Sequence, residues 1–374
     1  MTVCSVIAEF DPFHNGHAYL LNKARELTHA DVLVVLMSGN FLQRGEPAII
    51  DKWKRAKEAL SSQADLVIEL PINVSMQAAH LFAQGAVSMA AQLGSDYLVF
   101  GSEHPELNYN YLVEKAQNLK FEGSNHAQSF AAQLFKTLAQ QTGTELKTAN
   151  DILAFNYFLA NQKVETSKMK LVPVQRLESD HSDRSLNFAH FASASAIRKA
   201  RFKKNKNYEI FIPEQTKKDL AGPVVSWNDL WPYLKYRVLT TSAEEIGQIY
   251  GVSEGIENRI KAIIQKTTDF TTFIQALKTK RYTYTHLQRL CLAITLNLKK
   301  GQMLNQKSVF RVLGFNPIGQ QYLHQMQVLN LLVLSRIGKE ESDSVYRITC
   351  QADQIYSLLT GQEQTIGRKP IILV

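Results

Sequence analysis

The sequence predicts an α/β protein in two parts: a parallel β-sheet covered by helices, followed by a mainly helical and basic part. Two observations support this prediction. Short apolar runs alternate with helical patterns over residues 2–100, as is typical of a parallel sheet with helices on both faces. From residue 231 onward the apolar residues are spaced as in helices. Because 374 residues exceed one usual core, we expect domains at 1–205 and 206–374.

Strands and helices alternate in the first part. Apolar runs predict strands at 2–8, 31–37, 65–70 and 96–100, and helical spacing predicts helices at 16–28, 51–61 and 74–93. Further on, we expect helices within 105–165 and a strand at 170–174. Ligands of such sheets bind at the carboxyl ends of the strands. The residues that follow each strand are therefore the first candidates for a site.

The second part is predicted to be largely helical. The expected helices lie at 232–240, 243–250, 253–266, 269–278, 283–299 and 319–336. The stretch 201–230 is the best candidate for a linker, because it contains Pro213, Gly222 and Pro223. Residues 346–348 and 371–374 are expected to return as strands.

Basic residues are concentrated in the second part of the chain. Residues 1–200 contain 18 Lys and Arg against 20 Asp and Glu, whereas residues 201–374 contain 24 against 14, so the net charges are −2 and +10. Residues 258–339 hold a single acidic residue, Asp269. A solvated surface usually mixes both signs. The asymmetry therefore favours a surface that binds a polyanion such as nucleic acid.

Cysteine usage and hydropathy exclude several classes of protein. Cys4, Cys291 and Cys350 lack the spacing of a zinc site, which predicts a reduced, cytoplasmic protein without a bound metal. No apolar run is long enough to cross a membrane, and the first residues lack the pattern of a signal peptide. Nothing in the sequence indicates an obligate protein partner.

The residues after the first expected strand carry the strongest functional signal. His14, Gly16 and His17 stand in a His-Asn-Gly-His run where a helix begins. A helix N-terminus presents free N–H groups to phosphate, and glycine lets the backbone approach it. Two imidazoles there can stabilise charge on an α-phosphate under attack. Two surface histidines are the alternative, but the strand–loop–helix position favours adenylyl transfer.

Other loops at strand ends carry weaker signals. Arg44, after the second strand, can pair with a phosphate or a carboxylate substrate. Gly101, after the fourth strand, allows a base or ribose to lie against the backbone, and Arg176 can reach phosphate from the end of the next strand. Each also fits an ordinary turn or a solvated arginine. Taken by itself, Asn150 fits the N-cap of a helix.

Ser193, Ser195 and Arg198 form a possible second phosphate site. Hydroxyl groups at a helix start, with an arginine one turn further on, suit a leaving pyrophosphate. The alternative is a simple helix cap, which serine readily supplies.

Aromatic and basic residues alternate from Arg281 to Arg289. Arginine can bind RNA phosphates, and tyrosine can stack on bases. A helix start with inward-packed tyrosines is the alternative, but the scarcity of acidic residues nearby favours RNA contact by Lys280, Arg281, Tyr284 and Arg289. By contrast, no Gly-x-x-x-x-Gly-Lys-Ser/Thr or Gly-x-Ser-x-Gly run is present, so P-loop and α/β-hydrolase chemistry are unsupported.

These residues resemble the bacterial tRNA(Met) cytidine acetate ligases, a family of the nucleotidyltransferase superfamily whose motif is HxGH. The resemblance is specific over residues 2 to about 200 and looser beyond. Five runs carry it: Glu9-Phe-Asp-Pro-Phe-His-Asn-Gly-His17, Ser38-Gly-Asn-Phe-Leu-Gln-Arg-Gly-Glu-Pro47, Phe100-Gly-Ser-Glu103, Asn150-Asp-Ile-Leu-Ala154 and Ser193-Ala-Ser-Ala-Ile-Arg198. It implies a Rossmann-like nucleotidyltransferase domain followed by a helical tRNA-binding domain.

The resemblance also implies a reaction. ATP, with Mg²⁺, and acetate would give acetyl-adenylate and pyrophosphate. The acetyl group would then pass to N4 of the wobble cytidine of elongator tRNA(Met), forming N4-acetylcytidine. A carboxylate and a phosphate repel each other, so the site must supply polar and positive groups. The candidates for catalysis are His14, His17, Arg44, Ser193 and Arg198.

The resemblance further implies where ATP is held. The expected contacts are Ile7, Ala8, Glu9, Phe10, Asp11, Pro12, Phe13, His14, Asn15, Gly16, His17, Ala18, Tyr19, Leu20, Gly101, Asn150 and Arg176. Two departures from the family pattern stand out. Phe10-Asp11 replaces the usual Tyr-Asn, which adds a charge near phosphate. Asn150-Asp151 replaces a frequent pair of asparagines, so either residue could contact the nucleotide.

Two other functions explain part of the sequence. A nucleotidyltransferase acting on a small cofactor phosphate would explain the histidine pair but not the basic second part. An RNA-binding protein with a decayed active site would explain the basic part, although the complete set of motifs argues against it.

Overall fold

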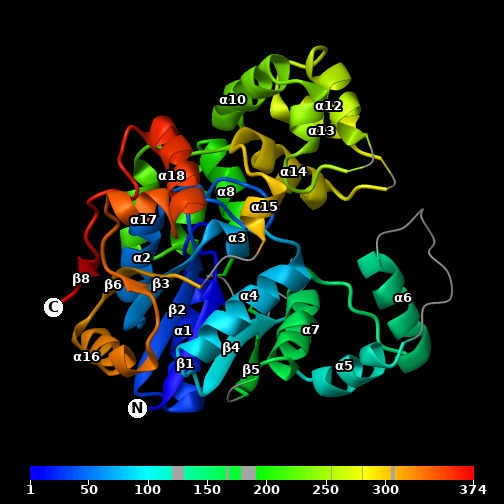
Figure 1. Cartoon of the computed structure of the whole chain (residues 1–374). Helices are drawn as coiled ribbons and strands as arrows, with labels where there is room; N and C mark the ends of the chain where they lie inside the picture. Colours follow the sequence, from blue (N-terminus) through cyan, green and yellow to red (C-terminus); the bar gives the residue numbers. More distant parts are fainter. Residues whose placement is uncertain (120–129, 166–167, 178–190, 254, 280, 305–307) are drawn as a thin grey trace.

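The computed structural model describes residues 1–119, 130–165, 168–177, 191–253, 255–279, 281–304 and 308–374. Its centre is a mixed β-sheet with strand order β5–β4–β1–β2–β3–β6–β7, and β8 pairs with β6 (Figure 1). The strands are β1 Val3–Ala8, β2 Val32–Ser38, β3 Leu66–Leu70, β4 Tyr97–Ser102, β5 Lys170–Gln175, β6 Phe310–Phe315, β7 Val333–Leu334 and β8 Ile371–Ile372.

The first five strands confirm the predicted parallel sheet. β1 pairs in parallel with β2 and β4, β2 with β3, and β4 with β5. The β1–β2 register runs from Val3↔Val32 to Ala8↔Met37. Because parallel strands end at the same edge, the loops after β1, β2 and β4 are brought together there.

The second part of the chain adds strands to the same sheet. β6 pairs antiparallel with β3, and β7 and β8 pair in parallel with β6. The sequence does not predict β6, because Arg311 and Gly314 interrupt its apolar run. In the structure Arg311 is fully buried and donates hydrogen bonds to the carbonyl oxygens of Leu334 and Arg368. The division of the chain at residue 205 stays a prediction.

Two other expectations for the C-terminal elements are wrong, and one is confirmed. Residues 319–336 do not form one helix, because α16 ends at Gln325 and a 3₁₀ turn and β7 follow. Residues 346–348 are not a strand, because α18 begins at Arg347. The strand expected within 371–374 is β8.

Helices cover both faces of the first five strands, as predicted (Figure 1). The expected helix at 74–93 is interrupted, because Met76 leaves the helical conformation between α3 and α4. The helices of this part are α1 Asn15–Thr28, α2 Lys52–Leu60, α3 Ile72–Ser75, α4 Ala79–Gln92, α5 Tyr109–Gln117, α6 Phe130–Thr142, α7 Ala149–Gln162 and α8 Ala194–Phe202.

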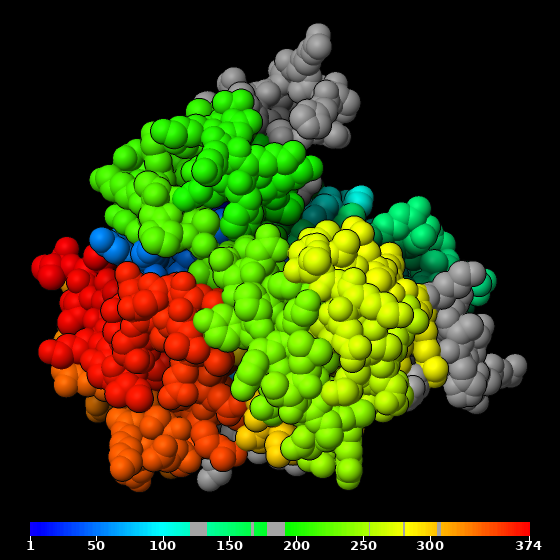
Figure 2. Space-filling model, turned by 90° about the horizontal axis from the view of Figure 1, so that it is seen from above, coloured from blue at the N-terminus to red at the C-terminus, as the bar shows by residue number. Residues whose placement is uncertain are grey.

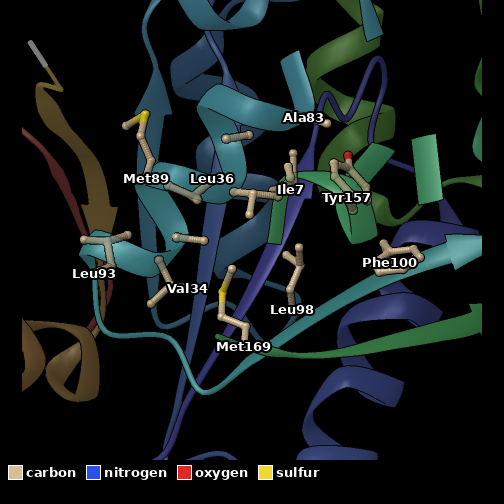
Figure 3. Close-up of a cluster of buried hydrophobic side chains, with 14 of the residues drawn as sticks. Ile7, Val34, Leu36, Ala83, Met89, Leu93, Leu98, Phe100, Tyr157 and Met169 are labelled. Atoms are coloured by element: carbon tan, nitrogen blue, oxygen red, sulfur yellow. The ribbon is translucent and has the colours of Figure 1, made fainter. Parts of the chain in front are cut away.

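Alternating side chains of the strands fill a core on each face. Val34 and Leu36 of β2 belong to the core on the face of the sheet that α4 and α7 cover, and Phe100 and Tyr157 belong to the same core (Figure 3). Val35 points to the opposite face, which α1 and α2 cover. Residues two apart on a strand share a face, so the nearly continuous apolar runs are explained by burial on both sides.

Most of the remaining helices form a third core. Its α10, α12, α13 and α14 lie beyond the carboxyl ends of the strands (Figure 1), and the second part of the chain covers most of the face seen in Figure 2. The helices after α8 are α9 Glu214–Ala221, α10 Trp227–Thr240, α11 Ala243–Gly247, α12 Ile256–Ile264, α13 Phe270–Leu277, α14 Tyr284–Thr295, α15 Lys300–Met303, α16 Pro317–Gln325, α17 Lys339–Asp343 and α18 Arg347–Thr360. Within the described ranges, none of the helices is both long and apolar enough to span a membrane.

The expected linker at 201–230 is instead packed against the first part. Tyr208, Ile212 and Leu220 are buried together with Ile49 and Ile197. Arg201 donates to the carbonyl oxygen of Leu220 at 2.6 Å. The polar and Pro/Gly-rich composition of this stretch reflects short helices and turns rather than a free tether.

A buried ion-pair cluster joins the C-terminal helix to the sheet. The Nζ of Lys52, at the start of α2, lies 2.7 Å from Glu69 on β3 and 2.5 Å from Asp353 on α18. Asn40, after β2, donates to Asp353 at 2.8 Å. All four side chains are buried, so α18 is held next to the loop that follows β2.

Candidate active site

A cavity of about 1870 Å³ lies at the carboxyl ends of β1 and β4. Its walls include the loop after β1, the start of α1, the loop after β4, the starts of α7 and α8, and α14. Small-molecule sites usually enclose roughly 300–1,000 Å³, so this cavity has room for more than one ligand. Its position is where parallel sheets bind ligands.

His14 and His17 stand at the start of α1 with stacked rings, whose centroids are 3.7 Å apart. His14 caps the helix, because its Nδ1 accepts a hydrogen bond from the Gly16 N–H at 3.0 Å. The Nδ1 of His17 accepts one from the His14 N–H at 3.3 Å. A neutral ring whose Nδ1 accepts carries its proton on Nε2. Both rings line the cavity.

Both imidazoles are neutral at physiological pH. Burial, and then the positive charge of Arg176, lower the pKa of His14 to about 3. Burial, His14 and Arg176 lower the pKa of His17 well below its usual value. The two rings can therefore donate Nε2–H hydrogen bonds to phosphate oxygens, while the arginine supplies the positive charge.

Gly101, Asn150 and Arg176 come together around Glu103 on the cavity wall. The Nε of Arg176 lies 3.3 Å from Glu103 Oε1, and Asn150 Nδ2 donates to the same oxygen at 2.5 Å. Arg176 also lies close over Gly101, where an added Cβ would stand 3.0 Å from its Cγ. These three residues, predicted from separate loops, thus form one surface facing the histidines.

Asp151 has a structural position that distinguishes it from Asn150. Its carboxylate is buried and accepts hydrogen bonds from Ser102 at 2.7 Å, from Thr148 at 2.7 Å and from the ring of His104 at 2.6 Å. Burial raises the pKa of Asp151, but these hydrogen bonds outweigh burial and lower it to about 2. Asn150 lines the cavity and Asp151 does not, so Asn150 is the one of the two that a ligand in the cavity would meet.

Arg198 of α8 reaches the loop after β1. Its Nη1 donates to the Asp11 carbonyl oxygen at 2.6 Å and lies 3.2 Å from Asp11 Oδ2. Its Nη2 lies 3.3 Å from Glu46. Ser193 caps α8 by accepting a hydrogen bond from the Ala196 N–H. Ser193, Ser195 and Arg198 all line the cavity, although Arg198 is also held by two carboxylates.

The loop 41–47, between β2 and α2, links this site to the helical part. Arg44 in this loop is exposed and lines the cavity. Gly45 has φ +80°, and an added Cβ would stand 2.3 Å from the Arg289 nitrogen of α14. Trp227 of α10 donates its Nε1–H to the Gly45 carbonyl oxygen at 2.9 Å. Only glycine fits this conformation so close to another backbone.

α14 and the residues before it bring basic and aromatic groups to the cavity. Arg281, Tyr282, His286 and Arg289 line it. Arg289 donates to the Gln43 carbonyl oxygen at 3.3 Å, and burial lowers its pKa to about 10, so the guanidinium stays charged. The rings of Tyr282 and His286 stack with centroids 5.4 Å apart. This wall suits a nucleotide base and its phosphates.

Some predicted contacts lie off the cavity wall. Tyr284 is exposed and does not line the cavity, and Lys280 lies outside the described residues. Four residues of the first loop and α1 also do not line the cavity: Pro12, Phe13, Asn15 and Ala18. A direct role for each of these residues stays a prediction.

Comparison with known proteins agrees with this geometry. The family model described as HIGH Nucleotidyl Transferase matches residues 1–369. Proteins named tRNA(Met) cytidine acetate ligase from Pediococcus pentosaceus and Lactiplantibacillus plantarum are 40% and 39% identical to the chain. The matches span 100% and 99% of this chain and 98% of each relative. The chain belongs to the tRNA(Met) cytidine acetate ligase family.

Solved structures extend the comparison. The apo crystal structure of Thermotoga maritima TmcAL superposes with a TM-score of 0.86 at 27% identity and covers all of both chains. The structure of the same protein bound with alpha-thio ATP gives a TM-score of 0.85 over the same range. The nucleotidyltransferase fold predicted for this member of the tRNA(Met) cytidine acetate ligase family is thereby confirmed.

Two residues at the site of this tRNA(Met) cytidine acetate ligase family member were not predicted from the sequence. Arg55 of α2 is fully buried and donates to the carbonyl oxygens of Glu9 and Ser38 at 2.6 and 3.0 Å, which fixes the ends of β1 and β2. His286 lines the cavity with its Nε2 buried and without a hydrogen-bond partner among the described residues. The sequence holds one sign that Arg55 could be buried: it follows Lys52 by three residues, which places both side chains on one helix face.

Proposed function

We propose that this protein activates acetate with ATP as acetyl-adenylate and transfers the acetyl group to N4 of the wobble cytidine of elongator tRNA(Met), giving N4-acetylcytidine. One observation carries the proposal: the histidine pair at the start of α1 and Arg289 of α14 line the same cavity. A helix start that presents two imidazoles and a helix that carries Arg289 therefore meet in one chamber, as a reaction between an adenylate and an RNA requires.

In the first step, an acetate oxygen attacks the α-phosphorus of ATP, and the bond to the bridging oxygen breaks to release pyrophosphate. His14 and His17 donate Nε2–H to the phosphate oxygens on which charge accumulates. Arg176 supplies positive charge next to both rings. Arg44, Ser193 and Arg198 complete the contacts to acetate or to the leaving pyrophosphate.

Mg²⁺ would accompany ATP in this step. Among the described residues, no cluster of three or more His, Cys, Asp or Glu side chains could hold a metal ion. Mg²⁺ typically keeps several waters and binds one or two carboxylates together with substrate phosphates. The residues present therefore fit an ion carried mainly by the triphosphate.

In the second step, the cytidine amine attacks the acetyl carbon and AMP leaves. An acyl-adenylate hydrolyses in water, so the cavity must exclude solvent until the RNA binds. A wobble base lies in a single-stranded loop and can enter a pocket. Arg281 and Arg289 would hold the neighbouring phosphates, and the Tyr282–His286 stack would face the base. Because the substrate is a tRNA, we place the reaction in the cytoplasm.

The proposal is tested by following the two steps separately. Acetate-dependent exchange of pyrophosphate into ATP should occur without RNA, and mass spectrometry should find N4-acetylcytidine only when ATP, acetate and elongator tRNA(Met) are all present. The His14→Ala variant should fail in both assays. AMP attached to a small cofactor phosphate would identify the alternative nucleotidyltransferase instead. Absence of acetate-dependent exchange by the wild-type protein would contradict the proposal.

A further inference from the structure

We propose that Glu9 is the catalytic base that takes the proton from the cytidine amine during acetyl transfer. This inference rests on the proposed function and assigns a residue to its second step. It starts from the position of Glu9, which lies directly after β1 and whose half-buried side chain lines the cavity.

Glu9 lies between the phosphate side and the RNA side of the cavity. One of its oxygens, Oε1, accepts a hydrogen bond from the Gln43 N–H at 2.7 Å. The carbonyl oxygen of Gln43 accepts one from Arg289 of α14 at 3.3 Å. The carboxylate is thus separated from the RNA-facing arginine by a single residue. Its own backbone carbonyl is fixed by Arg55 at 2.6 Å.

The other acidic side chains of the cavity are already paired. Asp11 and Glu46 each lie within 3.3 Å of Arg198, and Glu103 lies 3.3 Å from Arg176. Glu9 forms no ion pair with any of the described residues, and its Oε2 has no hydrogen bond there. Of these four carboxylates, Glu9 is therefore the one with an oxygen available to a substrate.

The surroundings of Glu9 favour a strong base. Burial raises the pKa of the Glu9 carboxyl, the Gln43 N–H opposes this, Asp11 and Glu46 raise it further, and Arg44 lowers it. Tyr157 of α7 also faces it, and burial and the charge of Glu9 raise the pKa of that phenol beyond its usual range. A carboxylate with a raised pKa is a stronger base than an ordinary one.

The chemistry of the second step needs such a group. The N4 lone pair attacks the acetyl carbon, an N–C bond forms, and the C–O bond to the phosphate breaks so that AMP leaves with its electron pair. The nitrogen must lose one proton in the process, and the Glu9 carboxylate accepts it. In the first step acetate attacks as an anion and no proton has to be removed. A base acting on the amine is therefore needed only when RNA reacts.

This difference defines the test. Because Glu9 is among the expected ATP contacts, the test compares the two activities of the Glu9→Gln variant, and acetate-dependent pyrophosphate exchange should fall by a much smaller factor than acetyl transfer. Its single-turnover transfer from synthetic acetyl-adenylate to elongator tRNA(Met) should be slower by roughly 10²–10⁴-fold, the usual range for loss of a general base. The Glu106→Gln variant is the matched control, because Glu106 is exposed and lies off the cavity. It should match the wild type in both assays.

The pH profile supplies a readout that a structural role would not change. The wild-type transfer rate should rise with pH as Glu9 ionises and then level off, and the Glu9→Gln variant should lose this rise. If Glu9→Gln does not fold, Glu9→Asp decides, because it should transfer more slowly and keep a pH-dependent rise. Wild-type transfer rates, equal loss of both activities, or an unchanged pH profile in Glu9→Gln would overturn the proposal. Absence of exchange in the wild type would instead refute the proposed function.

Discussion

His14 and His17 stack at the start of α1 with centroids 3.7 Å apart, and in each ring Nδ1 is occupied as a hydrogen-bond acceptor. The pair therefore presents two Nε2–H donors to one cavity. Since burial keeps both rings neutral, we propose that they stabilise charge on a phosphate and do not exchange protons with the substrate. This separates phosphate stabilisation from the proton transfer assigned to Glu9.

Loss of either histidine should slow the activation of acetate. We expect His14→Ala and His17→Ala each to reduce acetate-dependent pyrophosphate exchange by about 10²–10³-fold, the usual effect of removing one donor to a developing oxyanion. His14→Gln should retain more activity than His14→Ala if it keeps a donor in place. Exchange by His14→Ala at the wild-type rate would contradict the assigned role.

The buried His14 should make folding stability depend on pH. Its pKa is about 3 in the folded protein and about 6.5 in the unfolded chain. Between these values only the unfolded chain binds the proton, so the stabilisation is complete above pH 6.5 and is lost as the pH falls toward 3. The expected loss is about 1.4 kcal/mol per pH unit. Urea unfolding at pH 7 and pH 5 should show a smaller loss in His14→Gln, and equal losses would contradict a neutral buried ring.

The ion-pair cluster around Lys52 should contribute strongly to stability. Lys52→Met leaves Glu69 and Asp353 buried without their cation, which should lower the free energy of unfolding by about 3–5 kcal/mol. Lys57→Met on the same helix is the control, because Lys57 is exposed and its replacement should change stability by less than about 0.5 kcal/mol. Chemical denaturation measures both, and similar values for the two variants would show that the cluster adds little.

Arg289 should serve the RNA step and not the activation of acetate. Arg289→Gln is expected to weaken tRNA binding and to reduce the salt dependence of binding by about 0.7–0.9 in the slope of log K against log salt, which corresponds to one lost phosphate contact. Pyrophosphate exchange should stay near the wild-type rate. Arg336→Gln removes an exposed charge away from the cavity and should leave binding unchanged. A loss of exchange in Arg289→Gln with normal tRNA binding would contradict this assignment.

Gly45 and Gly94 offer a matched test of the contact between loop 41–47 and α14. Both have φ near +75°, but a Cβ at Gly45 would stand 2.3 Å from the Arg289 nitrogen, whereas one at Gly94 meets nothing within 4 Å. Gly94→Ala should cost about 1–2 kcal/mol from backbone strain alone. Gly45→Ala should cost clearly more, because α14 must move. Equal thermal unfolding shifts in the two variants would show that the contact is not tightly packed.

Much of the fold could be predicted from local sequence. β1 to β4 are largely apolar runs, because helices bury both of their faces. β6 could not be predicted in the same way, since its place is set by pairing with β3, far away in the sequence, and its Arg311 donates hydrogen bonds to the carbonyl oxygens of Leu334 and Arg368, further along the chain.

The site was predictable where a motif combines residue type with position, as at His14 and His17. The sequence did not show which of two adjacent polar residues faces the cavity. In the structure Asn150 lines the cavity and Asp151 is buried. Arg55 stands in a lysine-rich helix, where an arginine is expected to face solvent, although it is buried beneath the site. Such roles depend on which carbonyl groups lie nearby, and the sequence pattern does not contain that information.

We propose that one cavity serves both the adenylate and the RNA. It is tested most directly by incubating the wild-type protein, His14→Ala and Arg289→Gln with ATP, labelled acetate and elongator tRNA(Met), and by measuring label in ATP exchange and in tRNA for each. We expect both activities in the wild type, neither in His14→Ala, and exchange with strongly reduced tRNA labelling in Arg289→Gln. Normal tRNA labelling by Arg289→Gln, or labelling by His14→Ala at the wild-type rate, would contradict it.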